Sequence, residues 1–370
     1  MTGRFGIHTG VVGHSGTASE TRTQGPSRGF ADHCKQNNVP SFLRRAGFRT
    51  TTISPFAERH SAWWFNAGFN EVFNTGKGGM ESAEDVTPTV LKWVKDNAAQ
   101  DNWFLHINYW DPHTPYRAPA SFGNPFADID LPTWITEEVL EKHKQAVGPR
   151  TAQDLSMYDD SPLPNYPRHV PRLDTLADVK RHLDGYDTQI AYMDSHLGQL
   201  FNALAEQNAL DDTAIFITAD HGENQGELGI YAEHATADQG TCRIPMLVRW
   251  DRWLYTRSYH DGFHLFPKEM LYDIVSDPYE QHDLAQSRPE LCREGASRLM
   301  NWHDHMMATQ PDGYDNDPLW TVLREGGPAH AHSKQHLEMY CARLEATGRG
   351  WAVPELRRRH CPPSPAQRGG

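Results

Sequence analysis

Two short polar motifs in the sequence carry side chains of the kinds that bind metals or transfer protons. The pair Asp220-His221 closely follows the apolar run Thr213–Thr218 and precedes Gly222, which allows a sharp turn. In open α/β sheets, ligands bind beyond the carboxyl ends of strands, and a carboxylate beside an imidazole there suits a divalent cation. An Asp-Gly turn that caps a helix fits the same residues equally well.

Two further histidines are candidates for the same site. His113 lies between Pro112 and Pro115 and follows the apolar run Trp103–Tyr109, so we expect a rigid loop that presents a polar side chain. His234, fourteen residues after Asp220, is able to bind an anion or protonate a leaving group. The structural alternatives are a hydrogen-bonded core histidine at 113 and a solvent-exposed loop histidine at 234.

The elements that must position these residues alternate between helix and strand. Apolar periodicity predicts helices over Val39–Ala46, Asp85–Ala98, Glu137–Lys144 and Leu176–Ala209, and strands over Phe48–Ile53, Trp103–Tyr109, Thr213–Thr218 and Ile244–Val248. Such alternation predicts an α/β fold, with a mostly parallel sheet sandwiched by helices.

The pattern of predicted helices and strands changes after Trp250, which suggests a division into domains. We expect an α/β domain over 1–250, with the Pro- and Asp-rich stretch 111–175 as a cap or site-lining excursion. A smaller C-terminal α+β subdomain is expected over 251–345. Its predicted elements are the hairpin Trp253–Tyr259 with Glu269–Ile274 and the helix Pro289–Met307. Residues 346–370 are expected to form a disordered tail.

Composition excludes several classes of protein. The 370 residues carry a formal net charge of −13, which argues against nucleic acid or an anionic membrane as a partner. No run approaches the roughly 20 apolar residues of a membrane helix, and no signal peptide is visible. The five cysteines form no CxxC pair, so a reducing, cytoplasmic location is expected. A small anionic substrate remains compatible with a locally positive pocket.

Several motifs, in this order and spacing, resemble the type I sulfatases of the alkaline phosphatase superfamily. The resemblance covers roughly residues 1–310. Its motifs are Thr2-Gly3-Arg4 with His8 and Gly10, Leu43-Arg44-Arg45-Ala46-Gly47-Phe48, Pro112-His113-Thr114-Pro115-Tyr116, Tyr186 to Asp194, Thr218-Ala219-Asp220-His221-Gly222-Glu223, Arg243-Ile244-Pro245, Leu271-Tyr272-Asp273, Asp277-Pro278 and Asp283-Leu284-Ala285.

The resemblance implies sulfuric ester hydrolysis by metal-assisted attack of a formylglycine on a small sulfated sugar or aryl ester. It assigns Asp220 and His221 to a divalent cation, most often Ca²⁺, with Mn²⁺ or Mg²⁺ as alternatives. It assigns His113 to contact with the sulfate or the leaving oxygen. His234 falls where many members of the family have lysine, eleven residues before Pro245, and is assigned to sulfate binding or acid catalysis.

The sequence also departs from the family pattern. The Cys-x-Pro-Ser-Arg motif that supplies formylglycine is absent, as is the first strand with its metal-binding Asp pair, so we expect an N-terminally truncated and inactive chain. The family's Gly-Lys-Trp-His is replaced by Ser54-Pro55-Phe56-Ala57, for which Arg59 and His60 are candidate substitutes in substrate binding. An internal deletion is expected after Trp250. The rival hypotheses are a phosphonate monoester or phosphodiester hydrolase of the same superfamily and a non-catalytic remnant that binds a metal or a partner.

Overall fold

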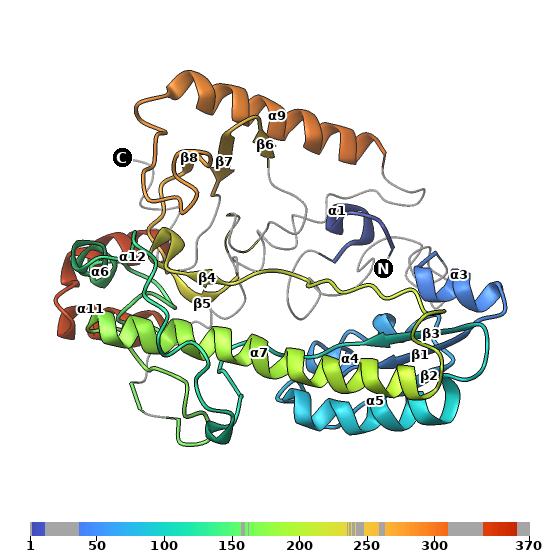
Figure 1. Ribbon diagram of the computed structural model, residues 1–370. Coiled ribbons are helices and arrows are strands. Elements are labelled where there is room, and N and C mark those ends of the chain that lie inside the picture. The colour runs from blue at the N-terminus through green and yellow to red at the C-terminus, as the bar shows by residue number, and fades with distance from the viewer. Residues whose placement is uncertain are drawn as a thin grey trace.

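The computed structural model describes most of the chain, and its elements are labelled in Figure 1. The described residues are 2–11, 37–156, 160–161, 163–234, 236, 238, 241, 248–258, 263–309 and 336–360. The motif Arg243-Ile244-Pro245 and most of the predicted strand Ile244–Val248 lie outside these residues.

A parallel three-stranded sheet with the order β2-β1-β3 is the first layer of the fold. Its strands are β1 (Arg49–Ile53), β2 (Glu71–Phe73) and β3 (Trp103–Ile107). Helix α3 (Val39–Arg45) leads into β1, and the Asn38 side chain caps it by accepting a hydrogen bond from the Ser41 backbone at 2.8 Å. The predicted α/β class is therefore confirmed.

Helices α5 (Ala83–Asn97) and α7 (Leu176–Glu206) run side by side against one face of this sheet (Figure 1). A capping box begins each helix, at Ser82 and at Thr175. The core between helices and sheet is apolar; it contains Ile53, Val86, Val90, Trp93, Val94, Ala98, Leu200, Leu204 and Ala209. Among the described residues, no helix is both long and apolar enough to cross a membrane.

The opposite face of the sheet is covered by aromatic side chains of the segment 63–69, which includes the 3₁₀ helix η2 (Trp63–Asn66). Phe69 stacks on Phe104, with ring centroids 6.2 Å apart, and Phe65 meets the edge of His106 at 5.6 Å. The α/β class holds, but the second face of the sheet is covered by the aromatic segment 63–69 and its 3₁₀ helix, where the sequence predicted helices on both faces.

A second, antiparallel sheet of β6 (Val248–Trp250), β7 (Trp253–Arg257) and β8 (Glu269–Asp273) packs against α9 (Pro289–Ala308). The predicted pairing of the two segments now called β7 and β8 is confirmed. The domain boundary predicted at 250 falls within the β6–β7 hairpin, because Trp250 pairs with Trp253 across a tight turn. Residues 248–250 therefore belong to the C-terminal sheet.

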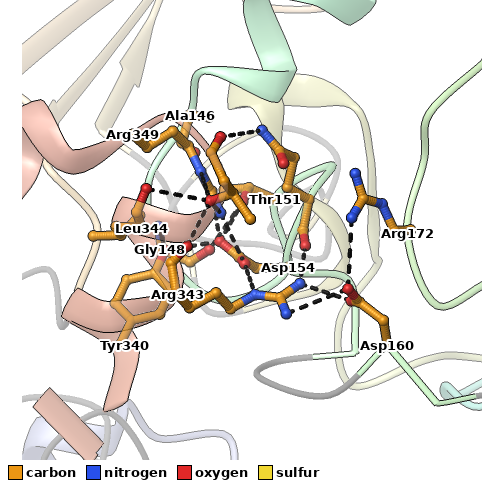
Figure 2. Close-up of polar contacts among 12 residues, drawn as sticks. Ala146, Gly148, Thr151, Asp154, Asp160, Arg172, Tyr340, Arg343, Leu344 and Arg349 are labelled. Atoms are coloured by element: carbon orange, nitrogen blue, oxygen red, sulfur yellow. Dashed lines mark hydrogen bonds and ion pairs between the residues drawn. The ribbon is translucent and has the colours of Figure 1, made fainter. Parts of the chain in front are cut away.

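The C-terminal helices α11 (His336–Ala346) and α12 (Val353–His360), joined by η5 (Gly350–Ala352), correct the prediction of a disordered tail from 346. Their apolar faces bury Leu344 and Leu356, and residues 361–370 lie outside the described chain. Polar contacts reinforce this packing (Figure 2): Arg349 and Asp154 are both fully buried and joined at 2.7 Å. Arg343 and Tyr340 also donate to the Asp154 carboxylate, at 2.6 and 2.8 Å.

The apolar run Thr213–Thr218 was predicted to be a strand, and this prediction is wrong. In Figure 1 the segment after α7 runs back across the view as an extended ribbon toward β4. No described strand pairs with it, and the Phe216 and Ile217 side chains are 90% and 69% exposed. A strand is defined by its hydrogen-bonded neighbour, so high β propensity without a partner leaves an extended loop.

The remaining described elements are short and connect the layers. They are α1 (Gly6–Thr9), α4 (Phe56–Arg59), η3 (Ala120–Phe122), α6 (Glu137–Lys144), β4 (Asn224–Gln225), η4 (Glu227–Gly229) and β5 (Tyr231–Glu233). Of these, α6 has the bounds that the sequence predicts.

Candidate functional site

The loop after β3 holds His113 in a defined orientation. Its Nδ1 lies 2.6 Å from the Thr114 carbonyl oxygen, and since a carbonyl only accepts, Nδ1 carries the proton and donates it. The Nε2 atom therefore remains for an external ligand. Arg117 Nη1 donates to the His113 carbonyl oxygen at 2.9 Å, which places a guanidinium beside the same loop.

Two further imidazoles meet this loop from the segment 220–234. His221 and His234 stack nearly parallel, with ring centroids 3.7 Å apart and an interplanar angle of 10°. His234 also meets His113 edge to face, at 5.5 Å and 66°. Residues 113, 221 and 234 are thus brought into one continuous contact, although more than 100 residues separate the first from the others.

Burial sets the protonation of His113. Its pKa is lowered from 6.5 to about 4, mainly by loss of hydration. The hydrogen bond to the Thr114 carbonyl opposes this lowering, and the neighbouring His234 and Arg117 add to it by repelling positive charge. The ring is therefore neutral at pH 7 when no anion is bound. An anion placed against the ring has the opposite effect, since it favours the protonated form in which Nε2–H donates.

Arg59 ends α4, and His60, which follows it, is linked to the imidazole cluster through Trp110. Trp110 lies between two imidazoles, with ring centroids 5.8 Å from His60 and 5.7 Å from His113. The Arg59 side chain packs over Gly79, where an added Cβ would come within 2.6 Å of its Cδ. Its charge also contributes to lowering the pKa of Arg117, after the larger effect of burial.

Of the expected metal pair, Asp220 is exposed and His221 is half-buried. The Asp220 side chain is 79% exposed; its Oδ1 accepts a hydrogen bond from the His221 backbone at 3.0 Å. His221 donates from Nδ1 to the Gly222 carbonyl at 2.7 Å, which leaves Nε2 as its possible ligand atom. Within the described part of the chain, no three His, Cys, Asp or Glu side chains are grouped to hold a metal. Two ligands do not fit a calcium site, which takes six or more oxygens.

Two buried carboxyl groups flank the cluster, and sequence reasoning assigned a role to neither. Burial raises the pKa of both Asp111 and Glu223 to about 7. Asp111 accepts a hydrogen bond from Gln189 of α7, and Glu223 accepts one from Tyr116 at 2.7 Å. These contacts join positions 78 and 107 residues apart, so no local pattern marks them.

Arg117 is a further residue that the sequence reasoning missed. Its position directly after the motif Pro112–Tyr116 was the available signal, because a cation beside a histidine loop indicates an anion site.

Comparison with known families gives one match over most of the chain. The model of the family described as Sulfatase matches residues 1–261.

Curated relatives share about a quarter of the residues in the matched part. A choline-sulfatase of Rhizobium meliloti (strain 1021) is 25% identical over 202 residues, which are 50% of this chain and 36% of that protein. An iduronate 2-sulfatase of Mus musculus is 23% identical over 280 residues, 66% of this chain and 49% of that protein. The chain thus spans only about a third to a half of the length of these relatives.

Two solved structures with the same fold each match this chain with a TM-score of 0.53. The phosphonate monoester hydrolase SpPMH from Silicibacter pomeroyi is 15% identical, with 84% of this chain and 85% of that chain covered. BT4656, solved in complex with its substrate D-glucosamine-2-N,6-O-disulfate, is 13% identical, with 76% and 84% covered. At this identity the likeness shows the fold alone.

Proposed function

Since this chain belongs to the sulfatase family of hydrolases, we propose that its imidazole cluster receives the sulfate group of a small sulfated ester. The observation that carries the proposal is the continuous contact of His113, His234 and His221 beside Arg117. Side chains that can bear positive charge converge there, in a chain whose formal net charge is −13. A tetrahedral dianion is the ligand that such a cluster favours.

The substrate class rests on the relatives. The names choline-sulfatase and iduronate 2-sulfatase indicate sulfated substrates for those two relatives. BT4656 was solved with a sulfated glucosamine as its substrate. We extend this class to the present chain as a sulfated sugar or aryl ester.

The proposed roles follow from the orientation of each ring. His113 has its Nδ1–H fixed by the Thr114 carbonyl, so Nε2 is the atom that donates to a sulfate oxygen or passes a proton to the leaving oxygen. His234, stacked between the other two imidazoles, is the second candidate for anion binding or acid catalysis. Arg59 and His60 extend the positive edge of the site toward α4.

The nucleophile of the proposed reaction is a formylglycine, and none of the five cysteines in this sequence stands in the motif Cys-x-Pro-Ser-Arg. We therefore propose anion recognition by the 370-residue chain without turnover.

The family resemblance implies a divalent cation, most often Ca²⁺, and assigns Asp220 and His221 to it, but these two residues alone do not form a calcium site. Since the described residues supply only these two, we expect affinity no better than roughly millimolar. Micromolar binding by calorimetry that disappears in Asp220→Ala would show a complete site instead.

Titration calorimetry with inorganic sulfate at low ionic strength tests the proposed site. We expect His113→Ala and His234→Ala each to weaken binding about tenfold, while His305→Ala, an exposed residue of α9, does not. If sulfate binds equally to all four proteins, or not at all to the wild type, the assignment is wrong. Thermal unfolding of each variant separates a binding role from a structural one, because a structural histidine lowers the melting temperature and leaves affinity intact.

Titration calorimetry with phosphate and methylphosphonate distinguishes the sulfatase proposal from the rival phosphonate monoester or phosphodiester hydrolase. Preference for sulfate supports the sulfatase proposal, and preference for a phosphorus oxyanion supports the rival hydrolase.

A further inference from the structure

We propose that the hydrogen bond between Tyr116 and Glu223 is a positioning contact that holds the His113 loop against the His221 loop and so sets the spacing of the three imidazoles. The inference deepens the proposed function, on which it rests for the role of the cluster, while its geometric part can be tested independently.

The contact is short and shielded from water. Tyr116 Oη donates to Glu223 Oε1 at 2.7 Å, and the two residues are 0% and 8% exposed. The phenol donates to the carboxyl group in either of its protonation states, so the contact does not depend on the charge of Glu223. Inside a low-dielectric core, a satisfied bond of this kind fixes one arrangement, and an unmade one is costly.

Each end of the bond is tied to a ring of the cluster by very little chain. Tyr116 follows His113 by three residues, and Glu223 follows His221 by two. The intervening backbone has little freedom: Thr114 accepts from the His113 ring, and Gly222 accepts from the His221 ring. A displacement of either anchor therefore moves the imidazole beside it.

The surroundings of Tyr116 keep the anchor rigid. His182 of α7 lies behind the phenol, with Nε2 3.4 Å from Oη, and Gln225 approaches Oη from β4 at 3.4 Å. Gly185 leaves room for the ring, since an added Cβ there would come within 2.9 Å of Tyr116 Cδ2. The anchor thus connects the histidine loops to α7, the longest described helix.

The test compares two tyrosine variants that each lose one hydroxyl. Tyr116→Phe removes the proposed anchor. Tyr192→Phe removes a similar bond, from Tyr192 Oη to Glu84 Oε2 at 2.9 Å, which joins α7 to α5 and does not join the His113 loop to the His221 loop. Ring proximity is measured by NMR on ¹³C-histidine-labelled protein, through the contact between the His113 and His234 rings, and sulfate affinity is measured by calorimetry.

We expect Tyr116→Phe to lose the His113–His234 ring contact and to weaken sulfate binding about tenfold, the effect of one lost buried hydrogen bond. Tyr192→Phe is expected to keep both. Glu223→Gln, which retains an acceptor oxygen, should preserve the ring contact, whereas Glu223→Leu should abolish it.

The proposal is overturned if Tyr116→Phe keeps the ring contact and the sulfate affinity while losing as much thermal stability as Tyr192→Phe. A wild type that shows the ring contact but binds no sulfate would refute the proposed function, and the NMR comparison would still decide whether Tyr116 and Glu223 position the rings.

Discussion

Histidines with lowered pKa values make the free energy of unfolding depend on pH. Burial lowers the pKa of His143 and His169 from 6.5 to about 4, and that of His182 to about 3. Between pH 6.5 and pH 4 these histidines are protonated in the unfolded chain but neutral in the folded chain. Each of them therefore lowers the free energy of unfolding as the pH falls from 6.5 toward 4. Asp111 and Glu223, with pKa values raised to about 7, act in the opposite direction.

Because these effects oppose each other, we isolate one histidine by mutation. His143 is 4% exposed, and its Nδ1 lies 2.7 Å from the Tyr231 hydroxyl. His143→Gln removes the titrating ring, so its destabilising effect should be smaller at pH 5.5 than at pH 7.5, by about 1 kcal/mol. Urea unfolding of both proteins at both pH values measures this difference. An equal loss at the two pH values would contradict the buried, neutral state of His143.

The candidate site could be predicted from sequence only where its residues lie in local motifs. His113 and His221 each follow an apolar run, and the structure does bring their loops together with His234. Their catalytic and metal-binding roles remain predictions. The bond between Tyr116 and Glu223 was not predictable, because a hydrogen bond across 107 residues leaves no spacing signal.

At the scale of elements, the long helices α5, α7 and α9 and the strands β1, β3, β7 and β8 were predicted. The short strands β2, β4 and β5 were missed, and a strand was wrongly predicted over Thr213–Thr218. Helix periodicity is a property of the segment itself, as the start of α7 at Leu176 shows, with its capping box at Thr175 and Asp178. A strand also requires a neighbour, which local sequence does not report. β3 illustrates the same limit, because among the described strands it pairs with β1 on one side only and its five residues are all half-buried.

A mutation in the segment 213–218 tests whether this segment is an exposed loop, as in the structure, or a buried strand, as the sequence predicted. Phe216 is 90% exposed, so Phe216→Ser should change the free energy of unfolding by no more than about 0.5 kcal/mol. A Phe buried in a sheet core would instead lose about 3–5 kcal/mol on truncation. Chemical denaturation measures the difference, with Leu254→Ala, a fully buried residue of β7, as the destabilised reference. If Phe216→Ser loses as much stability as Leu254→Ala, Phe216 is buried and the predicted strand Thr213–Thr218 is correct after all.

The C-terminal helices should depend on the buried charges shown in Figure 2. Arg349→Met removes the fully buried partner of Asp154 and should cost about 3 kcal/mol or more, because it leaves that carboxylate undercompensated in the core. Arg357→Met breaks the exposed pair between α12 and Glu338 of α11 and should cost much less, because solvent screens the two charges. Denaturant melts of both variants test the contrast, and equal losses would mean that the network does not secure these helices.

At the scale of the whole molecule, the family match covers residues 1–261, yet the chain covers only about a third to a half of the length of its curated relatives. The fold and its sheet therefore follow from the family, whereas activity has to be argued from the residues present. The described chain brings three imidazoles together but offers only two ligands to a cation. Binding of an anion and turnover of an ester are thus separate questions for this protein.

We expect the purified 370-residue chain to show no turnover of an aryl sulfate, even with calcium present. Two-step covalent catalysis begins with a nucleophile, and neither Cys292 nor Cys341, both buried, nor any other cysteine lies in a Cys-x-Pro-Ser-Arg motif. The assay uses a chromogenic aryl sulfate and protein expressed in a host without sulfatases, with His113→Ala as a matched preparation. Turnover that is present in the wild type and lost in His113→Ala would show that this chain supplies its own nucleophile. If His113 has its proposed role, which is worth roughly 10²–10⁴-fold in rate, turnover equal in both preparations would identify a contaminant.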